Sequence, residues 1–368
     1  MATLNELFQT AYQLHRNGQY AQAESAYRQL IRQQPRHADA LHLLGVLCHQ
    51  TARHEEAATL IARAIAIDPD NADFLNNCGL ALRAAGRAQD AITCYEEAMR
   101  LSPKDADIQN NLGNAYQEAG RHAEAANCYR RVLRSHPQDA DLRQALVSVL
   151  MAEGDQHFAN GRFGDAEHCY QEAVTLAPDT AILHYNLGNA KRELGKAAEA
   201  AVLYKRYLAL APTDADGWNN LGNALRELGR LDEAVTAYRQ ALEHNPTLYH
   251  AKVHLVHQQQ HMCDWQGLDE SVACIRDWVR TKPEALVSPF AFLAMPGTTA
   301  AEQRLCALQW ARNRHQSLIE LGRNLAFNYV KTPGRKLHIG YLSGDFRLHP
   351  LAFLITEMIE LHDGEKFE

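Results

Sequence analysis

Small and aromatic residues recur at fixed positions along the first two thirds of the chain, in a unit of thirty-four residues. Prolines mark this unit, with five intervals of thirty-four residues and one of forty-one: Pro35, Pro69, Pro103, Pro137, Pro178, Pro212 and Pro246. An alanine stands twelve residues before every one of these prolines, and a glycine stands twenty-four residues before six of them. A tyrosine stands eight residues before six of them: Tyr27, Tyr95, Tyr129, Tyr170, Tyr204 and Tyr238. A period of this length is typical of stacked supersecondary units.

Each unit predicts a pair of helices, named here helix A and helix B. The glycine and the alanine allow the two helices to approach closely, and the tyrosine is expected to fill the space to the next pair. The proline is expected to end helix B and to stand at the start of the next helix A, where its missing N–H costs little. Gly120 and Gly229 are expected to supply the left-handed residue that ends a helix A.

This pattern resembles the tetratricopeptide repeat family over about Leu4 to Pro246. The resemblance implies a mainly helical fold, with seven repeats in residues 1–246 that form a right-handed superhelix and a concave groove lined by the helices A. The longer interval adds seven residues, about two helical turns, within 138–147. We expect a longer helix A near Asp141 to Asn160, with a hinge as the alternative.

The composition of the chain argues against a nucleic-acid partner and against a membrane span. The chain has 37 Lys and Arg against 44 Asp and Glu, a formal net charge of −7, and no long basic cluster. We therefore expect no nucleic-acid partner, because phosphate contacts need concentrated basic residues. No apolar run approaches the length of about 18 residues that a spanning helix needs, and the start is not signal-like, so neither a membrane span nor secretion is expected.

The eight cysteines include no CxxC pair. We interpret them as small buried hydrophobes in a reducing compartment, which predicts a cytoplasmic protein with no redox or zinc role and no metal site.

Asparagines form two columns on the predicted helices A. One column holds Asn77, Asn111, Asn186 and Asn220, and the other, three residues later, holds Asn114, Asn189 and Asn223. Residues three apart share a helix face, and each amide offers donors and an acceptor. The columns could therefore bind the backbone of an extended peptide. Alternatively, repeat duplication has copied a residue that a wet helix face tolerates.

Four histidines follow the last proline at helical spacing: His250, His254, His257 and His261. Such pairs can bind a metal, but no compact third ligand is evident, and a polar helix face is the simpler interpretation.

The pattern changes towards the end of the chain. Residues 247–335 predict a helical linker, which includes a helix from Ala300 to about Leu321. Residues 336–342 alternate like a strand, a loop follows, and a helical pattern begins at Leu351. We interpret 336–368 as the start of an α/β lobe, in which ligands bind at the carboxyl ends of strands.

The asparagine-bearing repeats, the segment CDW at 263–265 and the segment GYLSGDFRLHP at 340–350 together resemble the protein O-linked N-acetylglucosamine transferases and their SPINDLY-like relatives. The resemblance implies a GT-B catalytic region, of which this chain would hold only the beginning. His349 matches a histidine of that family's active site, where it would accept the proton of the attacking hydroxyl; otherwise it caps the helix. Asp345 is expected to stabilise the loop.

The resemblance thus implies the amino-terminal part of an enzyme that transfers N-acetylglucosamine from UDP-GlcNAc to Ser or Thr, with inversion. It implies acceptor proteins as partners, no cofactor and no metal requirement. This chain alone is expected to bind peptide without transferring sugar. Fucosyl transfer from a GDP-sugar and a purely non-catalytic scaffold are the alternatives.

Overall fold

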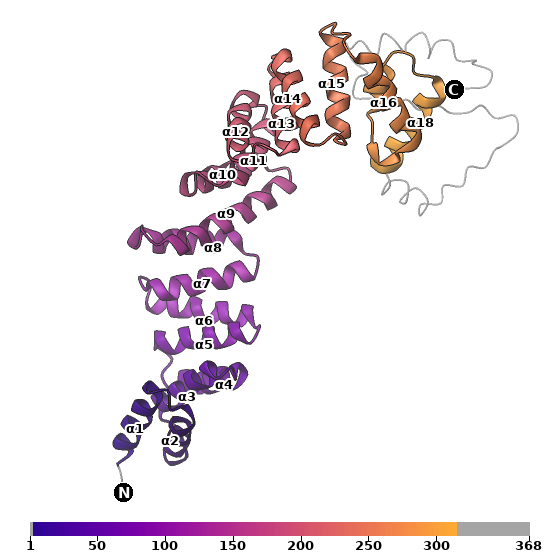
Figure 1. The fold of residues 1–368 in the computed structure, drawn as a ribbon. Coiled ribbons are helices and arrows are strands. Elements are labelled where there is room, and N and C mark those ends of the chain that lie inside the picture. Colours follow the sequence, from indigo (N-terminus) through magenta and orange to yellow (C-terminus); the bar gives the residue numbers. More distant parts are fainter. Residues whose placement is uncertain (1–2, 315–368) are drawn as a thin grey trace, which may run out of the picture. The chain divides into compact units, whose positions relative to one another are not determined.

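The computed structural model describes residues 3–314, which form helices and no strand (Figure 1). The chain divides into two compact units, Met1–Trp278 and Val279–Glu368. The first unit contains the repeats, and the second begins at Val279, within the helix Leu268–Thr281.

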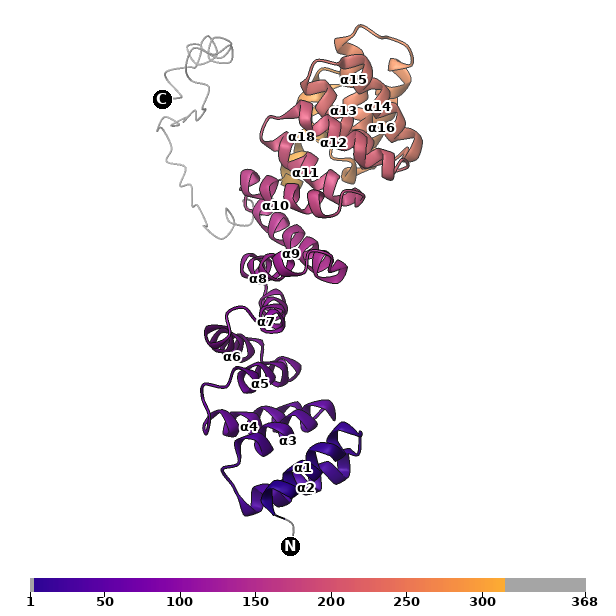
Figure 2. The same cartoon turned by 90° about the vertical axis from the view of Figure 1, so that its left-hand side faces the viewer.

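In the first unit, helices A and B alternate along the repeats (Figures 1 and 2). The helices A are α1 (Leu4–Arg16), α3 (Ala38–Gln50), α5 (Ala72–Ala84), α7 (Ala106–Glu118), α9 (Ala140–Ala159), α11 (Ala181–Glu193) and α13 (Ala215–Glu227). The helices B are α2 (Tyr20–Gln33), α4 (His54–Ile65), α6 (Ala88–Leu101), α8 (His122–Ser135), α10 (Phe163–Leu176), α12 (Ala197–Leu210) and α14 (Leu231–His244). The mainly helical repeat fold predicted from the period is therefore confirmed for this part of the chain.

The prolines lie between the helices and not at the start of helix A, so that part of the prediction was wrong. Pro103, for example, directly follows Ser102, the C-cap of α6, and precedes Asp105, the N-cap of α7. The Asp105 side chain accepts hydrogen bonds from the backbone N–H groups of Asp107 and Ile108. An acidic N-cap satisfies N–H groups that have no partner in the helix, so the helix starts there.

The turns from helix A to helix B behave as the sequence predicts. Gly120 and Gly229 have φ angles of 71° and 72°, in the left-handed region. Repeat two has Ala52 at this position, with φ of 60°. An alanine pays a steric cost there that glycine avoids.

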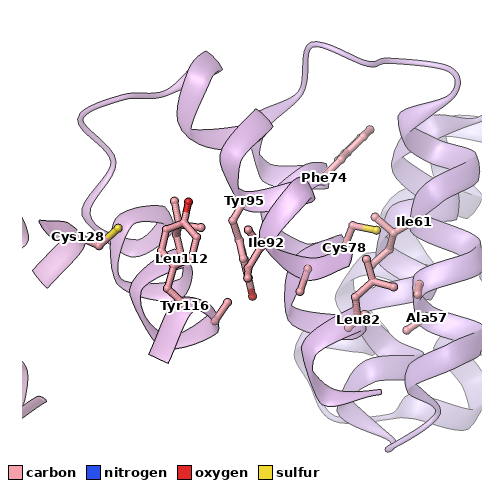
Figure 3. Packing of buried hydrophobic residues seen from close by; sticks show 14 of the residues in the cluster. Ala57, Ile61, Phe74, Cys78, Leu82, Ile92, Tyr95, Leu112, Tyr116 and Cys128 are labelled. Carbon is pink, nitrogen blue, oxygen red and sulfur yellow. The ribbon is translucent and has the colours of Figure 1, made fainter. Parts of the chain in front are cut away.

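The recurring tyrosine packs on the glycine of its own repeat, which corrects the expectation that it fills the space to the next pair. A Cβ atom added to Gly79 on α5 would lie 2.5 Å from Cε1 of Tyr95 on α6, and one added to Gly222 would lie 2.6 Å from Cε1 of Tyr238. The six tyrosines are at most 2% exposed, and Figure 3 shows Tyr95 among its apolar neighbours. The glycine therefore makes room for a ring on the facing helix.

The seven extra residues of repeat five lengthen its helix A. Helix α9 has 20 residues, whereas α7 and α11 have 13 each. It runs from the N-cap Asp139 to the C-cap Asn160 without interruption. This agrees with the longer helix expected there, and no break marks a hinge within it.

Helix pairing continues beyond Pro246. Helix α15 (Tyr249–His261) begins thirty-four positions after the first residue of α13, Ala215, so it stands one repeat further along. It is followed by α16 (Leu268–Thr281), and the rings of Tyr249 and Trp278 lie 4.9 Å apart. The start of the region predicted as a linker, 247–335, thus keeps the repeat register.

In the second unit, the described helices are η1 (Pro283–Ala285), α17 (Pro289–Leu293) and α18 (Ala300–Arg314). Phe292 and Cys306 are buried, and the Cys306 Sγ donates to the carbonyl of Val287 at 3.2 Å.

The predicted strand, loop and helix of 336–368 lie outside the described residues, as does His349. Within 3–314, no helix has both the length and the apolar character needed to cross a membrane.

Candidate functional site

The two asparagine columns lie on successive helices A. Asn77 lies on α5. Helices α7, α11 and α13 each carry two of the asparagines, one from each column. Because the columns are three residues apart, they share one side of each helix. We call this side the A-helix face and define it by the seven asparagines predicted to bind peptide.

The first column connects neighbouring repeats through the amide nitrogens. Asn111 Nδ2 donates to Asn76 Oδ1 at 3.0 Å, Asn220 Nδ2 donates to the Tyr185 hydroxyl at 2.9 Å, and a longer bond of 3.3 Å runs from Asn186 to Asp155.

At the other end of this column, Asn77 Nδ2 lies 2.8 Å from His42 Nε2. Burial lowers the pKa of His42, which keeps its ring neutral and able to accept. Within residues 3–314, no donor occupies the Oδ1 atoms of Asn77, Asn111 and Asn186.

The second column is held through its oxygens. The hydroxyls of Tyr129, Tyr204 and Tyr238 donate to the Oδ1 atoms of Asn114, Asn189 and Asn223 at 2.7, 2.7 and 2.9 Å respectively. These tyrosines are the repeating ones of helix B, and each stands fifteen positions after its asparagine. The Nδ2 groups of Asn114 and Asn223 have no acceptor in the described part of the chain, and Nδ2 of Asn189, which is near the Tyr185 hydroxyl, has a second hydrogen to donate.

Repeat five shows the same link with a different acceptor. Its second-column position is Asp155, whose Oδ1 accepts from the Tyr170 hydroxyl at 2.6 Å. An aspartate can therefore hold the tyrosine as an asparagine does, but it has no N–H to offer a ligand.

Three surface hollows open along the A-helix face. One of about 560 Å³ is lined by Asn114, one of about 240 Å³ by Asn186 and Asn189, and one of about 430 Å³ by Asn223. Part of both columns therefore borders space that a ligand can enter.

The histidines after the last repeat continue the asparagine register. His254 and His257 on α15 occupy the positions of Asn220 and Asn223, one repeat further along the chain. Burial, with the nearby charge of Arg226, lowers the pKa of His254 to about 4. His254 is therefore neutral near pH 7, and with Asn223 it lines the third hollow.

Sequence reasoning identified the columns but not how they are used. It treated every amide as fully available, whereas the structure engages one end of most amides with the protein. The constant spacing of fifteen positions between each second-column asparagine and its tyrosine was the available signal. His349, the predicted catalytic residue, lies beyond the described residues and stays a prediction.

The helix pairs and the A-helix face define a helical-repeat protein suited to hold another polypeptide. Family models for the tetratricopeptide repeat match residues 9–72 and 151–215, 106–139, and 215–248, and a further model described as TPR repeat matches 79–120. Together these ranges take up more than half of the sequence. The chain belongs to the tetratricopeptide repeat proteins.

A solved structure shares this fold. A chain in the structure of Naa15/Naa10 bound to HypK-THB is 20% identical, with a TM-score of 0.56 over 85% of this chain and 47% of that one. This chain thus spans about half of that relative's length. A tetratricopeptide repeat protein from Parabacteroides merdae is 16% identical, with a TM-score of 0.39 over 68% of this chain and 97% of that one. No curated protein matches the sequence.

Proposed function

We propose that the A-helix face holds an extended segment of another polypeptide by its backbone. One observation carries the proposal: the two columns leave opposite ends of their amides available. The second column is held by its oxygens and presents N–H donors, and most of the first column is held by its nitrogens and presents oxygens. An extended backbone offers both C=O and N–H groups along its length, so such a face suits peptides of unrelated sequence.

The test removes the second-column donors and keeps the tyrosine links. In the double variant Asn189→Asp and Asn223→Asp, each carboxylate can still accept from its tyrosine, as Asp155 does from Tyr170. Losing two peptide hydrogen bonds, each worth about 0.5–1.5 kcal/mol, should weaken binding by about tenfold. Fluorescence anisotropy with several uncharged peptides measures this, and each should lose affinity to a similar degree.

Asp155→Asn is the matched control, because it adds a donor where the chain has none. It should preserve or strengthen binding. Unchanged affinity in the double variant would mean that the asparagines serve packing alone. A loss confined to one peptide would instead indicate recognition of side chains.

We further propose that the bound polypeptide is an acceptor for O-glycosyl transfer, with N-acetylglucosamine moving from UDP-GlcNAc to Ser or Thr. The support is the sequence GYLSGDFRLHP at 340–350, outside the described residues, together with the repeats that precede it. His349 would accept the hydroxyl proton as the oxygen attacks the anomeric carbon, whose bond to the phosphate oxygen breaks to release UDP.

Incubation of the whole protein with a peptide and either UDP-GlcNAc or GDP-fucose tests this step. Transfer from UDP-GlcNAc that His349→Ala abolishes, without loss of peptide binding, would support the proposal. Transfer only from GDP-fucose would favour a fucosyltransferase. Peptide binding without transfer from either donor would favour a scaffold.

A further inference from the structure

Two positions of helix A that hold apolar side chains in most other repeats hold charged or polar side chains in repeat five. In repeat five both positions face a cysteine. Glu153 and His157 lie one turn apart on α9, and Cys169 lies on the facing helix α10. The matching positions of repeat four hold Leu112, Tyr116 and Cys128, which are all buried (Figure 3). The matching positions of repeat seven hold Leu221, Leu225 and Ala237, which are buried as well. A carboxylate and an imidazole thus replace core side chains in one repeat, opposite a thiol.

The three side chains converge. His157 Nε2 lies 3.7 Å from Glu153 Oε1, and one ligand atom from each residue lies within 4.8 Å of the others. Around a four-coordinate metal with bonds of about 2.0–2.3 Å, such atoms stand roughly 3.3–3.8 Å apart. Side-chain movements of about 1 Å would therefore bring the three ligand atoms to these distances around one ion.

These groups are costly to keep in a core without a further partner. The side chains of Glu153 and His157 are only 16% and 19% exposed, and Cys169 is 5% exposed. The Nε2 atom of His157 faces Glu153 and is the nitrogen placed to bind an ion, whereas its Nδ1 atom is buried and has no hydrogen-bond partner in the described part of the chain. Buried polar atoms normally have partners, and buried carboxylates are normally paired.

The surrounding charge favours a cation. Of the charged groups near Cys169, the carboxylates of Glu153, Glu172 and Asp165 are negative, and the guanidinium of Arg130 is positive. Glu172 binds Arg130 through two hydrogen bonds, of 2.8 and 2.7 Å. The guanidinium is therefore already paired with a carboxylate other than Glu153.

We propose that Glu153, His157 and Cys169 bind one divalent transition metal ion of the zinc class. A thiolate, an imidazole and a carboxylate form a mixed ligand set that suits zinc, and water would complete four-coordination. Binding releases the Cys169 thiol proton to solvent, and the two anionic ligands then neutralise the ion. The ion joins α9 to α10. Because the ligands come from two helices, no motif such as CxxC reveals the site.

The experiment uses Co²⁺ as the probe, added to the reduced, chelator-treated protein. Absorption from thiolate-to-cobalt charge transfer and intense visible bands should saturate at one ion per chain, and Zn²⁺ should displace both. Cys169→Ser should lose the charge-transfer absorption. Cys128→Ser is the matched control: it removes a buried thiol at the same repeat position, opposite Leu112 and Tyr116, and should keep that absorption.

A second variant guards against misfolding. Glu153→Gln keeps size and shape, and it should weaken Zn²⁺ binding by at least the roughly 10–100-fold that loss of an outer-shell partner costs. Cobalt uptake without thiolate absorption would place the ion elsewhere, for example on the histidines of α15, and would overturn the proposal. Wild-type affinity in both Cys169→Ser and Glu153→Gln would also overturn it.

Discussion

The tyrosine that recurs in six of the seven helices B has two roles, which differ from repeat to repeat. Its ring packs in the core, because the residue at the facing position of helix A is small: a glycine in five repeats and Ala11 in the first. Its hydroxyl finds a partner only where the second-column position is polar: Tyr238 donates to Asn223, whereas the buried hydroxyl of Tyr95 has no partner among the described residues. Leu80 stands at the position that would have provided one.

This difference predicts opposite outcomes for one substitution at two sites. Tyr238→Phe leaves the buried oxygen of Asn223 without its donor and should lower the free energy of unfolding by about 1 kcal/mol or somewhat more. Tyr95→Phe removes a hydroxyl that has no partner, so it should be neutral or slightly stabilising. Urea denaturation of both variants measures this. Equal losses at the two sites would show that the Tyr238–Asn223 bond contributes nothing net.

At this scale, the sequence predicts which residues recur but not the bonds they make. The period shows that Asn189 and Tyr204 keep a constant spacing, yet the spacing alone does not reveal that they share a hydrogen bond. That depends on how closely α11 approaches α12, which Gly188 permits. The sequence did not predict the cluster of Glu153, His157 and Cys169 for the same reason, because Cys169 lies near the other two only after α10 packs on α9.

At the scale of the element, helix lengths and turns follow from the sequence because their causes are local. The extra seven residues lengthen α9 by two turns and preserve its register, since two turns return a helix to nearly the same facing. The position of the prolines was not predicted correctly. The N-cap residues, such as Asp105, decide where each helix A begins.

Helix α15 continues the register with histidines in place of asparagines, and this predicts a pH-dependent stability. The pKa of His254 falls from an ordinary 6.5 to about 4 because burial, and then the positive charges of Arg226, His250, His257 and Arg192, disfavour protonation. The unfolded chain therefore binds the proton more tightly. Stability should be lost as the pH falls below about 6.5 and through about 4, with a loss of about 2 kcal/mol from His254 at pH 5.

His254→Asn places at this position the asparagine that Asn220 provides one repeat earlier. The variant should not show the part of the stability loss that comes from His254. Thermal denaturation at about pH 7.5 and about pH 5 gives the comparison. His261→Asn, at an exposed position of the same helix, is the control. His250 and His257 also have lowered pKa values, so some acid sensitivity should persist. If His254→Asn were as acid-sensitive as the wild type, the ring would be solvated in solution.

For the first unit as a whole, the main helix contacts join neighbours in the chain. From α1 to α15 each helix packs on the next, and the larger contacts between helices that are not neighbours in the chain join successive helices A, such as α3 and α5. Repeat proteins of this kind have stabilities that are close to a sum of local terms. The period alone was enough to predict this arrangement, whereas the fold of residues beyond 314 lies outside what the structure describes.

Local stability predicts that a core defect in one repeat stays near that repeat. In Gly222→Ala, the added Cβ would lie 2.6 Å from Cε1 of Tyr238, so the ring must move, at a cost of about 1–3 kcal/mol. Hydrogen exchange should therefore accelerate in α12 to α15 and stay unchanged in α1 to α8. Gly164→Ala is the control, because no atom lies within 4 Å of its added Cβ on α10. That change should slow exchange slightly, since alanine stabilises a helix by about 0.5–1 kcal/mol over glycine. Faster exchange throughout Met1–Trp278 in Gly222→Ala would instead show that the repeats unfold as one cooperative unit.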